Sequence, residues 1–332
     1  MKILLITFSI PKNKKEIRNF NDVLNFYLNF SLNKKVNCEC LKLPSGNLDK
    51  TFEIARSIEN LELNKYDAIL AASIHFFYQL NSEIKSILKK RFDGLLLQVS
   101  EGAWIKSSEV DIYLTLKDDI IHNHIKYFYY LKKRARNVTI GWAADHEILV
   151  PKQDKKNLHI LIDHSNYGKN LKKFGDSTKD IIEELKIFVF SNIWKNHYDY
   201  ITVRRLAAGK IVELKFTGDE IDNYDPHSNN ISFTEISKEY GKAHIFMVTH
   251  PESLGLTALE CAMAGALILS PKGFIHKDRL RTVRHYEYKK HIDWDLVLKL
   301  INVKKSREVA KMNNWSEVAN KIIEAIKKLK KR

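Results

Sequence analysis

The amino-acid sequence predicts an α/β protein of two domains, each built on a doubly wound parallel sheet. Short apolar runs alternate with helical patterns along the first half of the chain, as is typical of parallel sheets covered by helices. The same alternation repeats in the second half, after a polar segment that contains Pro151. With 332 residues, the chain is long enough for two domains that each bury a core.

Each half supplies its own strand and helix candidates. In the first half, the apolar runs at 3–8, 68–72, 94–99, 112–116 and 138–141 predict strands. Helical patterns cover 19–32, 51–60 and 82–90. In the second half, strands are expected at 158–163, 211–216, 231–233, 243–249 and 267–270.

The polar stretch at 142–156 marks the domain boundary. It predicts an amino-terminal domain of residues 1–150 and a carboxy-terminal domain of residues 151–332. The last helical pattern, at 315–330, carries an apolar stripe of Val318, Ala319, Ile322, Ile326 and Leu329. We expect this stripe to pack against the protein; an amphipathic anchor at a membrane surface is the alternative interpretation.

Composition limits the class of protein. No apolar stretch approaches the roughly 18 residues that span a bilayer, and the amino terminus is typical of a first strand instead of a signal peptide. We therefore expect a cytoplasmic protein. Cys38, Cys40 and Cys261 are too few for a disulfide framework and lack the companion ligands of a zinc site, so reduced thiols are expected.

The formal net charge of +15 raises the question of an anionic partner. Lysine, asparagine and isoleucine are all abundant, as a coding bias would produce, and the basic residues are spread along the chain. Two clusters stand out, one around Lys12 to Arg18 and one at the carboxyl terminus, 327–332. A solvated face and an anionic surface explain these clusters equally well.

The segment 243–270 carries the most specific pattern. It reads as a strand, an acidic turn, a helix and a second strand, with Gly255 at the first turn of the helix and Gly265 at its end. The free N–H groups and the dipole of a helix start favour a phosphate. Glu252 precedes this position and Glu260 follows it within the helix. A phosphate site beside two hydroxyl-binding carboxylates suits a sugar nucleotide.

This segment resembles the donor-binding signature of the retaining glycosyltransferases of family 4, which have the GT-B fold. Glu252 and Glu260 match its two glutamates, which are separated by seven residues, and Met263, Ala264 and Gly265 match its small-residue helix end. The resemblance implies two Rossmann-like domains facing a central cleft, with a last helix that packs back across the junction. An ordinary strand–helix–strand unit with two solvent-facing glutamates is the alternative interpretation.

The resemblance also implies roles for the residues of this segment. Glu252 would contact the transferred sugar, Glu260 would bind the ribose hydroxyls, and backbone N–H groups would bind the diphosphate. The positions expected to contact the donor here are Ser253, Leu254, Gly255 and Leu256.

Two departures from the family pattern concern charge and catalysis. Lys169 matches a diphosphate-binding lysine, but His164 stands near the position of the family's arginine; we expect Arg204 or Arg205 to supply the missing charge. The family also carries a histidine after a strand of the first domain, and the stretch 96–104 has none. Glu101 is a candidate general base there. His75, which lies beside aromatic residues, is the second candidate, and a structural role for it is the simpler interpretation.

The function expected from the resemblance is transfer of a sugar from a nucleotide-sugar donor to a saccharide or lipid-linked glycan, with retention and without a metal or other cofactor. An anionic membrane surface is an expected peripheral partner. Two alternatives stay open: a glycosyltransferase of the same fold that acts on a nucleic-acid base, and a non-catalytic protein that binds sugar nucleotides. Asp293 and Asp295 resemble an acidic metal motif, but helix capping explains them better.

Overall fold

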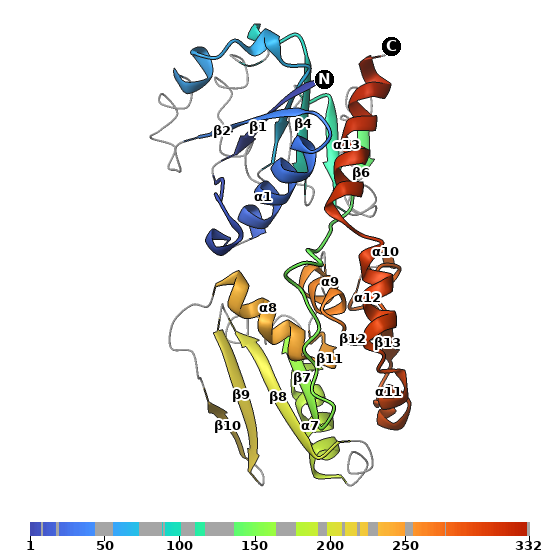
Figure 1. The fold of residues 1–332 in the computed structure, drawn as a ribbon. Helices are drawn as coiled ribbons and strands as arrows, with labels where there is room; N and C mark the ends of the chain where they lie inside the picture. Colours follow the sequence, from blue (N-terminus) through green and yellow to red (C-terminus); the bar gives the residue numbers. More distant parts are fainter. Residues whose placement is uncertain are drawn as a thin grey trace. The chain divides into compact units, whose positions relative to one another are not determined.

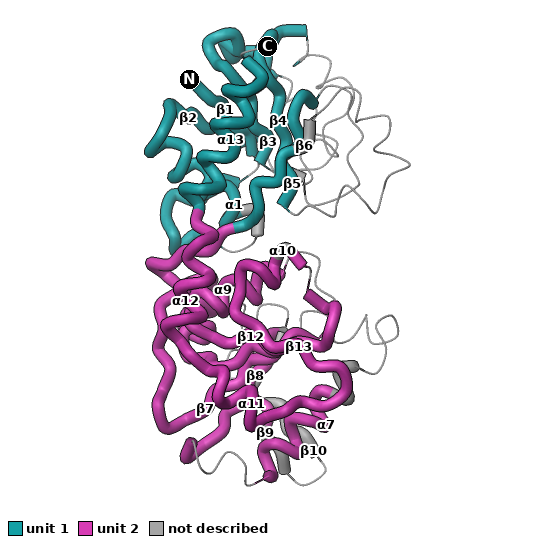
Figure 2. Tube along the Cα trace, turned by 90° about the vertical axis from the view of Figure 1, so that its right-hand side faces the viewer, with its two compact units in different colours: residues 1–142, 315–332 teal, residues 143–314 magenta. Residues whose placement is uncertain are grey.

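The computed structural model describes residues 1–7, 9–17, 20–43, 56–72, 88, 90–100, 110–116, 136–163, 177–191, 198–207, 210–217, 220–224, 232–249, 255–275 and 277–330. The chain forms two compact units, of residues 1–142 with 315–332 and of residues 143–314 (Figure 2). This division differs from the predicted domains 1–150 and 151–332. The second unit begins at Ala143, and the last helix belongs to the first unit.

The first unit contains a six-stranded sheet of order β2-β1-β3-β4-β5-β6, in which every pair is parallel. Its strands are β1 (Lys2–Thr7), β2 (Asn37–Lys42), β3 (Ala68–Ala71), β4 (Leu95–Ser100), β5 (Ile112–Thr115) and β6 (Arg136–Thr139). Five of them confirm the predicted runs. The sequence analysis missed β2, because this edge strand is only partly buried and so lacks an apolar run.

Helices α1 (Phe20–Asn33) and α13 (Trp315–Lys330) pack against each other in the first unit. Tyr27 of α1 stacks on Trp315 with ring centroids 5.4 Å apart, and Trp142 meets Trp315 edge-on at 5.0 Å. Val318, Ala319, Ile322 and Ile326 are buried, so the predicted apolar stripe is covered within this unit. The unit also contains short 3-10 turns at Lys14–Glu16 and Leu63–Lys65. Residues 56–59 of the helix predicted at 51–60 are helical, and 51–55 lie outside the described residues; of the helix predicted at 82–90, only residues 88 and 90 are described, and both are helical.

The second unit contains a seven-stranded sheet of order β10-β9-β8-β7-β11-β12-β13 (Figure 1). Its strands are β7 (Asn157–Asp163), β8 (Tyr200–Ala207), β9 (Lys210–Thr217), β10 (Glu220–Tyr224), β11 (Ile245–Met247), β12 (Leu267–Pro271) and β13 (His285–Tyr288). Neighbouring strands are parallel from β8 through β7, β11 and β12 to β13. Strand β9 pairs antiparallel with β8 on one side and with β10 on the other. The predicted α/β fold with a parallel sheet in this unit is confirmed; the antiparallel pairs at its edge were not predicted, and they arise because the short links between β8, β9 and β10 permit only hairpins.

The strand predicted at 231–233 was also wrong. Phe233 begins helix α8 (Phe233–Lys242), and the preceding Ser232 caps it. The Ser232 hydroxyl accepts a hydrogen bond from the N–H of Glu235, and the Glu235 carboxylate accepts one from the N–H of Ser232. This capping box satisfies two N–H groups at the helix start, which outweighs the short apolar run that had suggested a strand.

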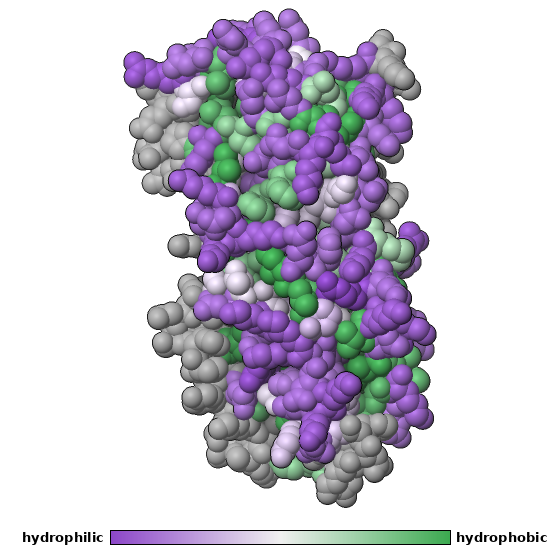
Figure 3. Space-filling model, in the orientation of Figure 1, coloured by the Kyte–Doolittle hydropathy of each residue, from purple (hydrophilic) through white to green (hydrophobic). Residues whose placement is uncertain are grey.

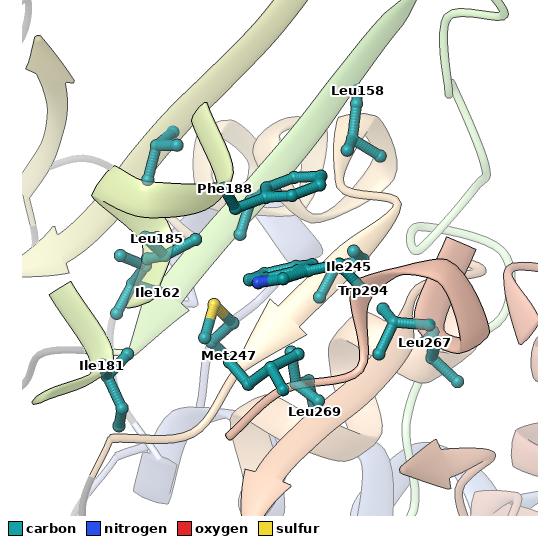
Figure 4. Close-up of a cluster of buried hydrophobic side chains, with 14 of the residues drawn as sticks. Leu158, Ile162, Ile181, Leu185, Phe188, Ile245, Met247, Leu267, Leu269 and Trp294 are labelled. Carbon is teal, nitrogen blue, oxygen red and sulfur yellow. The ribbon is translucent and has the colours of Figure 1, made fainter. Parts of the chain in front are cut away.

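One face of the second sheet is covered by α7 (Ser177–Phe190) and α11 (Trp294–Leu300). Phe188 and Trp294 stack at the centre of this cluster, with ring centroids 3.9 Å apart (Figure 4). Residues of α8, α9 (Leu256–Met263) and α12 (Val303–Lys311) do not belong to it; α9 packs instead on β12, α8 and α12. We conclude that α8, α9 and α12 cover the opposite face.

Asp293 has the capping role that the sequence predicts. Its side chain accepts a hydrogen bond from the N–H of Leu296, 3.0 Å away, at the start of α11. Within the described ranges, His, Cys, Asp and Glu side chains do not gather in groups of three or more that could hold a metal ion.

Hydrophilic residues dominate the molecular face drawn in Figure 3, with only small hydrophobic areas between them. Of the helices that the structure describes, none is long and apolar enough to cross a membrane.

The buried His244 gives the second unit a sensitivity to acid. Its Nδ1 accepts a hydrogen bond from the N–H of His159, 3.2 Å away, which requires an unprotonated nitrogen. Burial lowers the pKa of His244 to about 4 and also lowers the pKa of His159. Between pH 6.5 and 4, His244 therefore binds more protons in the unfolded chain than in the folded chain, so its contribution to stability is lost as the pH falls through this window.

We expect His244→Asn to reduce this acid sensitivity, because an asparagine oxygen can accept the same hydrogen bond and does not titrate. The wild type should lose about 2–3 kcal/mol more than the variant between pH 6.5 and 4. Urea unfolding at several pH values measures the difference. If the stabilities of the two proteins changed with pH in the same way, His244 would not be the cause of the acid sensitivity.

Candidate functional site

The predicted site residues divide between described and undescribed parts of the chain. The structure describes Arg204, Gly255, Leu256 and Glu260. The remaining predicted residues lie outside the described residues; they are His75, Glu101, His164, Lys169, Glu252, Ser253 and Leu254.

Helix α9 begins at a left-handed glycine. Gly255 is its N-cap, with φ 59° and ψ 43°, and Leu256 is its first residue. A β-carbon on residue 255 would lie only 2.9 Å from Cγ of Arg279, so this turn excludes a side chain both by its backbone conformation and by its neighbour. The free N–H groups of the first helical turn lie beyond the carboxyl end of β11, where ligands bind parallel α/β sheets.

Glu260 lies about one turn inside α9 and is 9% exposed. This burial overturns the alternative in which both glutamates of the signature face solvent. Tyr240 of α8 hydrogen-bonds to the Glu260 side chain, and Arg279 attracts its charge. Both contacts favour the carboxylate, but the loss of hydration on burial outweighs them and raises the pKa of Glu260 to about 8.

Arg279 is a neighbour of this helix start that the sequence analysis missed. It lies in the short helix α10 (Lys277–Leu280) and is 6% exposed. Its Nη1 donates a hydrogen bond to Oγ1 of Thr282 at 3.1 Å, and that hydroxyl donates to the backbone oxygen of Arg279 at 2.8 Å. The surrounding sequence is rich in lysine and arginine, so nothing in it distinguishes the buried cation from exposed ones.

Arg204 occupies a different environment. Its guanidinium forms ion pairs with Glu239 at 2.7 Å and with Glu213 at 3.3 Å, and Lys242 contacts Glu239 as well. Glu239 and Lys242 lie in the last turns of α8, which leads into the amino end of β11. The helix start of α9 follows the opposite end of that strand. These contacts hold the Arg204 guanidinium at the last turns of α8, and Arg279 is the arginine that contacts Gly255.

The carboxyl end of α9 is held by two side chains from distant parts of the second unit. Arg307 of α12 donates to the backbone oxygens of Met263 at 3.1 Å, Leu149 at 2.5 Å and His146 at 2.6 Å. Nε2 of Gln153 donates to the oxygens of Ala243 and Ala264, at 2.9 and 3.0 Å. The segment 146–153 is thereby fastened to the end of this helix.

No protein-family model and no curated protein sequence match the chain. Solved structures do match it over nearly its full length. Sucrose-phosphate synthase from Thermosynechococcus elongatus superposes with a TM-score of 0.59 at 10% identity, covering 99% of this chain and 98% of that chain. AviGT4, a glycosyltransferase involved in avilamycin A biosynthesis, gives 0.52 at 8% identity, with 99% and 97% covered. The chain has the GT-B fold.

A third GT-B match is Anabaena HepE in complex with UDP and glucose, with a TM-score of 0.52 at 11% identity and coverages of 98% and 99%. At such identities the likeness establishes the fold alone. Beyond the fold, the candidate site rests on the chain's own geometry, which brings Gly255, Glu260 and Arg279 together at the start of α9.

Proposed function

We propose that this protein is a glycosyltransferase that binds a nucleotide-sugar donor in its second unit, at the start of α9. The observation that carries the proposal is the buried Glu260 one turn inside a helix that begins at the left-handed Gly255. A carboxyl whose pKa is raised this far by burial is typical of functional sites. Free N–H groups beside a buried carboxyl offer both phosphate and hydroxyl recognition, which is what a sugar nucleotide presents.

The residue roles in this proposal are those that the resemblance of segment 243–270 to the donor-binding signature implies. In the proposal, the first-turn N–H groups of α9 bind the donor diphosphate and Glu260 accepts hydrogen bonds from the ribose hydroxyls. Glu252 contacts the transferred sugar, and Lys169 and His164 approach the phosphates. The bound UDP and glucose of HepE, a protein of the same fold, support a nucleotide-sugar ligand of this general kind.

For the acceptor we propose a saccharide or a lipid-linked glycan, with transfer that retains configuration and needs no metal. Glu101 or His75 would assist deprotonation of the acceptor hydroxyl. Stabilising the diphosphate leaving group and placing the acceptor close to the sugar supply much of the rate enhancement, so the missing family histidine is compatible with turnover. The basic clusters support a cytoplasmic enzyme that meets an anionic membrane surface.

Titration calorimetry against UDP-, GDP- and ADP-sugars tests the donor site. We expect one class to bind, and Glu260→Ala to weaken that binding by about tenfold or more, because the hydrogen bonds between Glu260 and the ribose hydroxyls are lost.

Glu308→Ala is the matched control, since Glu308 is an exposed glutamate of α12 in the same unit. It should bind as the wild type does. If no sugar nucleotide binds, or if Glu260→Ala binds like the control, the donor-site proposal fails. Donor binding without transfer or donor hydrolysis across a broad acceptor panel would show that the protein is a binding protein and not an enzyme. Sugar transfer to DNA would show that the acceptor is a nucleic acid.

A further inference from the structure

We infer that Arg279 is the cation that binds the donor diphosphate, in place of the arginine that the family pattern has near His164 in the sequence. The inference rests on the donor site proposed above. Three features of the second unit lead to it: the position of Arg279, its burial, and an unpartnered serine hydroxyl near the carboxyl end of β12.

The position of Arg279 is fixed against the turn that would hold the phosphates. Its Cγ lies 2.9 Å, and its Cβ and Cδ lie 3.6 Å, from the point that a β-carbon on residue 255 would occupy. The aliphatic part of the side chain therefore covers the Gly255 turn, in space that only a glycine leaves open. The hydrogen bond to Thr282 and the attraction to Glu260 place the guanidinium beside the first turns of α9.

Burial makes this positive charge effective. A guanidinium stays protonated at all accessible pH values, and Arg279 is only 6% exposed to solvent. A dianionic diphosphate at the same helix start would meet this permanent charge where water screens the interaction least.

Ser270 provides an independent sign of a ligand at this edge of the sheet. It lies near the carboxyl end of β12, and its side chain is fully buried. Its Oγ lacks a hydrogen-bond partner throughout the part of the chain that the structure describes. Because Leu267 and Leu269 face the α7 and α11 cluster, alternation along the strand turns Ser270 toward the face that α9 covers. A phosphate oxygen there would satisfy this hydroxyl.

The test separates the diphosphate from the rest of the donor. Calorimetry would compare UDP, GDP and ADP with their monophosphates and nucleosides on the wild type and on Arg279→Met, which removes the charge and keeps the aliphatic stem. We expect the variant to lose about ten- to a hundredfold in diphosphate affinity, with little change for the nucleoside. Arg279→Lys should recover only part of the loss, because a lysine lacks the planar fork of donors.

Arg281→Met is the matched control, because Arg281 is an exposed arginine two residues away. It should leave the diphosphate preference unchanged. Thermal unfolding of each variant reports whether the fold is intact, and if Arg279→Met does not fold, Arg279→Lys decides. Wild-type protein that binds none of the nucleotides would overturn the donor site itself. Wild-type binding with an undiminished diphosphate preference in the Arg279 variants would overturn this inference alone.

Discussion

Glu260→Gln should make the second unit more stable than the wild type at pH 8 and nearly equal to it at pH 5. In the unfolded chain this carboxyl loses its proton near pH 4.5, whereas in the folded protein it keeps the proton up to about pH 8. Between these values Glu260 binds more protons in the folded chain than in the unfolded chain, so its contribution to wild-type stability falls as the pH rises. Each unit of pKa corresponds to about 1.4 kcal/mol, which predicts a gain of about 3–4 kcal/mol for the glutamine at pH 8.

The measurement is urea unfolding of both proteins at pH 5, 6.5 and 8. Only their difference matters, because it cancels the titration of His159 and His244, which acts in the opposite direction at lower pH. Glutamine still accepts the hydrogen bond from Tyr240, and Glu308→Gln serves as the exposed control. A difference that does not change with pH would mean that Glu260 ionises at its ordinary pKa in the folded protein.

Trp294→Ala should destabilise the second unit by about 3–5 kcal/mol, the usual range for removing a buried tryptophan. The indole stacks on Phe188 at a centroid distance of 3.9 Å, and both side chains are at least nine-tenths buried. An alanine would leave a cavity between α7, α11 and the sheet that these rigid elements cannot close. Hydrogen exchange at the amides of β7 and β11 reports this loss without assuming that both units unfold together.

Trp294→Phe is the conservative control for the same position. The Nε1 of Trp294 makes no hydrogen bond that the described part of the structure records, so the smaller aromatic ring gives up packing only. We expect it to cost less than half as much as alanine. Equal costs for the two substitutions would show that the cavity does not determine the effect.

The sequence predicted those parts of the fold that depend on local periodicity. The interior strands β1, β3 and β7 are buried and read as apolar runs, and Asp293 caps α11 where a cap was expected. The edge strand β2 alternates polar and apolar residues without such a run. The hairpins β8–β9–β10 were missed for a different reason. Whether two strands pair parallel or antiparallel depends on the length of the link between them, and the ends of these strands could not be located from the sequence.

The candidate site could likewise be predicted only where its sequence signals are local. The turn at Gly255 and the helix that carries Glu260 were predicted, because glycine and helix-end signals are local. The burial of Glu260 and the approach of Arg279 come from packing between α8, α9 and α10, which no local pattern encodes. Arg204 was chosen for its position near a strand end, and the carboxylates of Glu213 and Glu239 that bind it could not be assigned to it from sequence.

The attachment of Arg307 and Gln153 to the last carbonyls of α9 has a mechanical consequence. Hydrogen bonds from Arg307 and Gln153 join residues 146–153 to the end of this helix at Leu149, Met263 and Ala264. A displacement of α9 along its axis would therefore have to break these hydrogen bonds or move residues 146–153 with the helix. The start of α9 is in this way connected, through the helix and Arg307, to the first residues of the second unit.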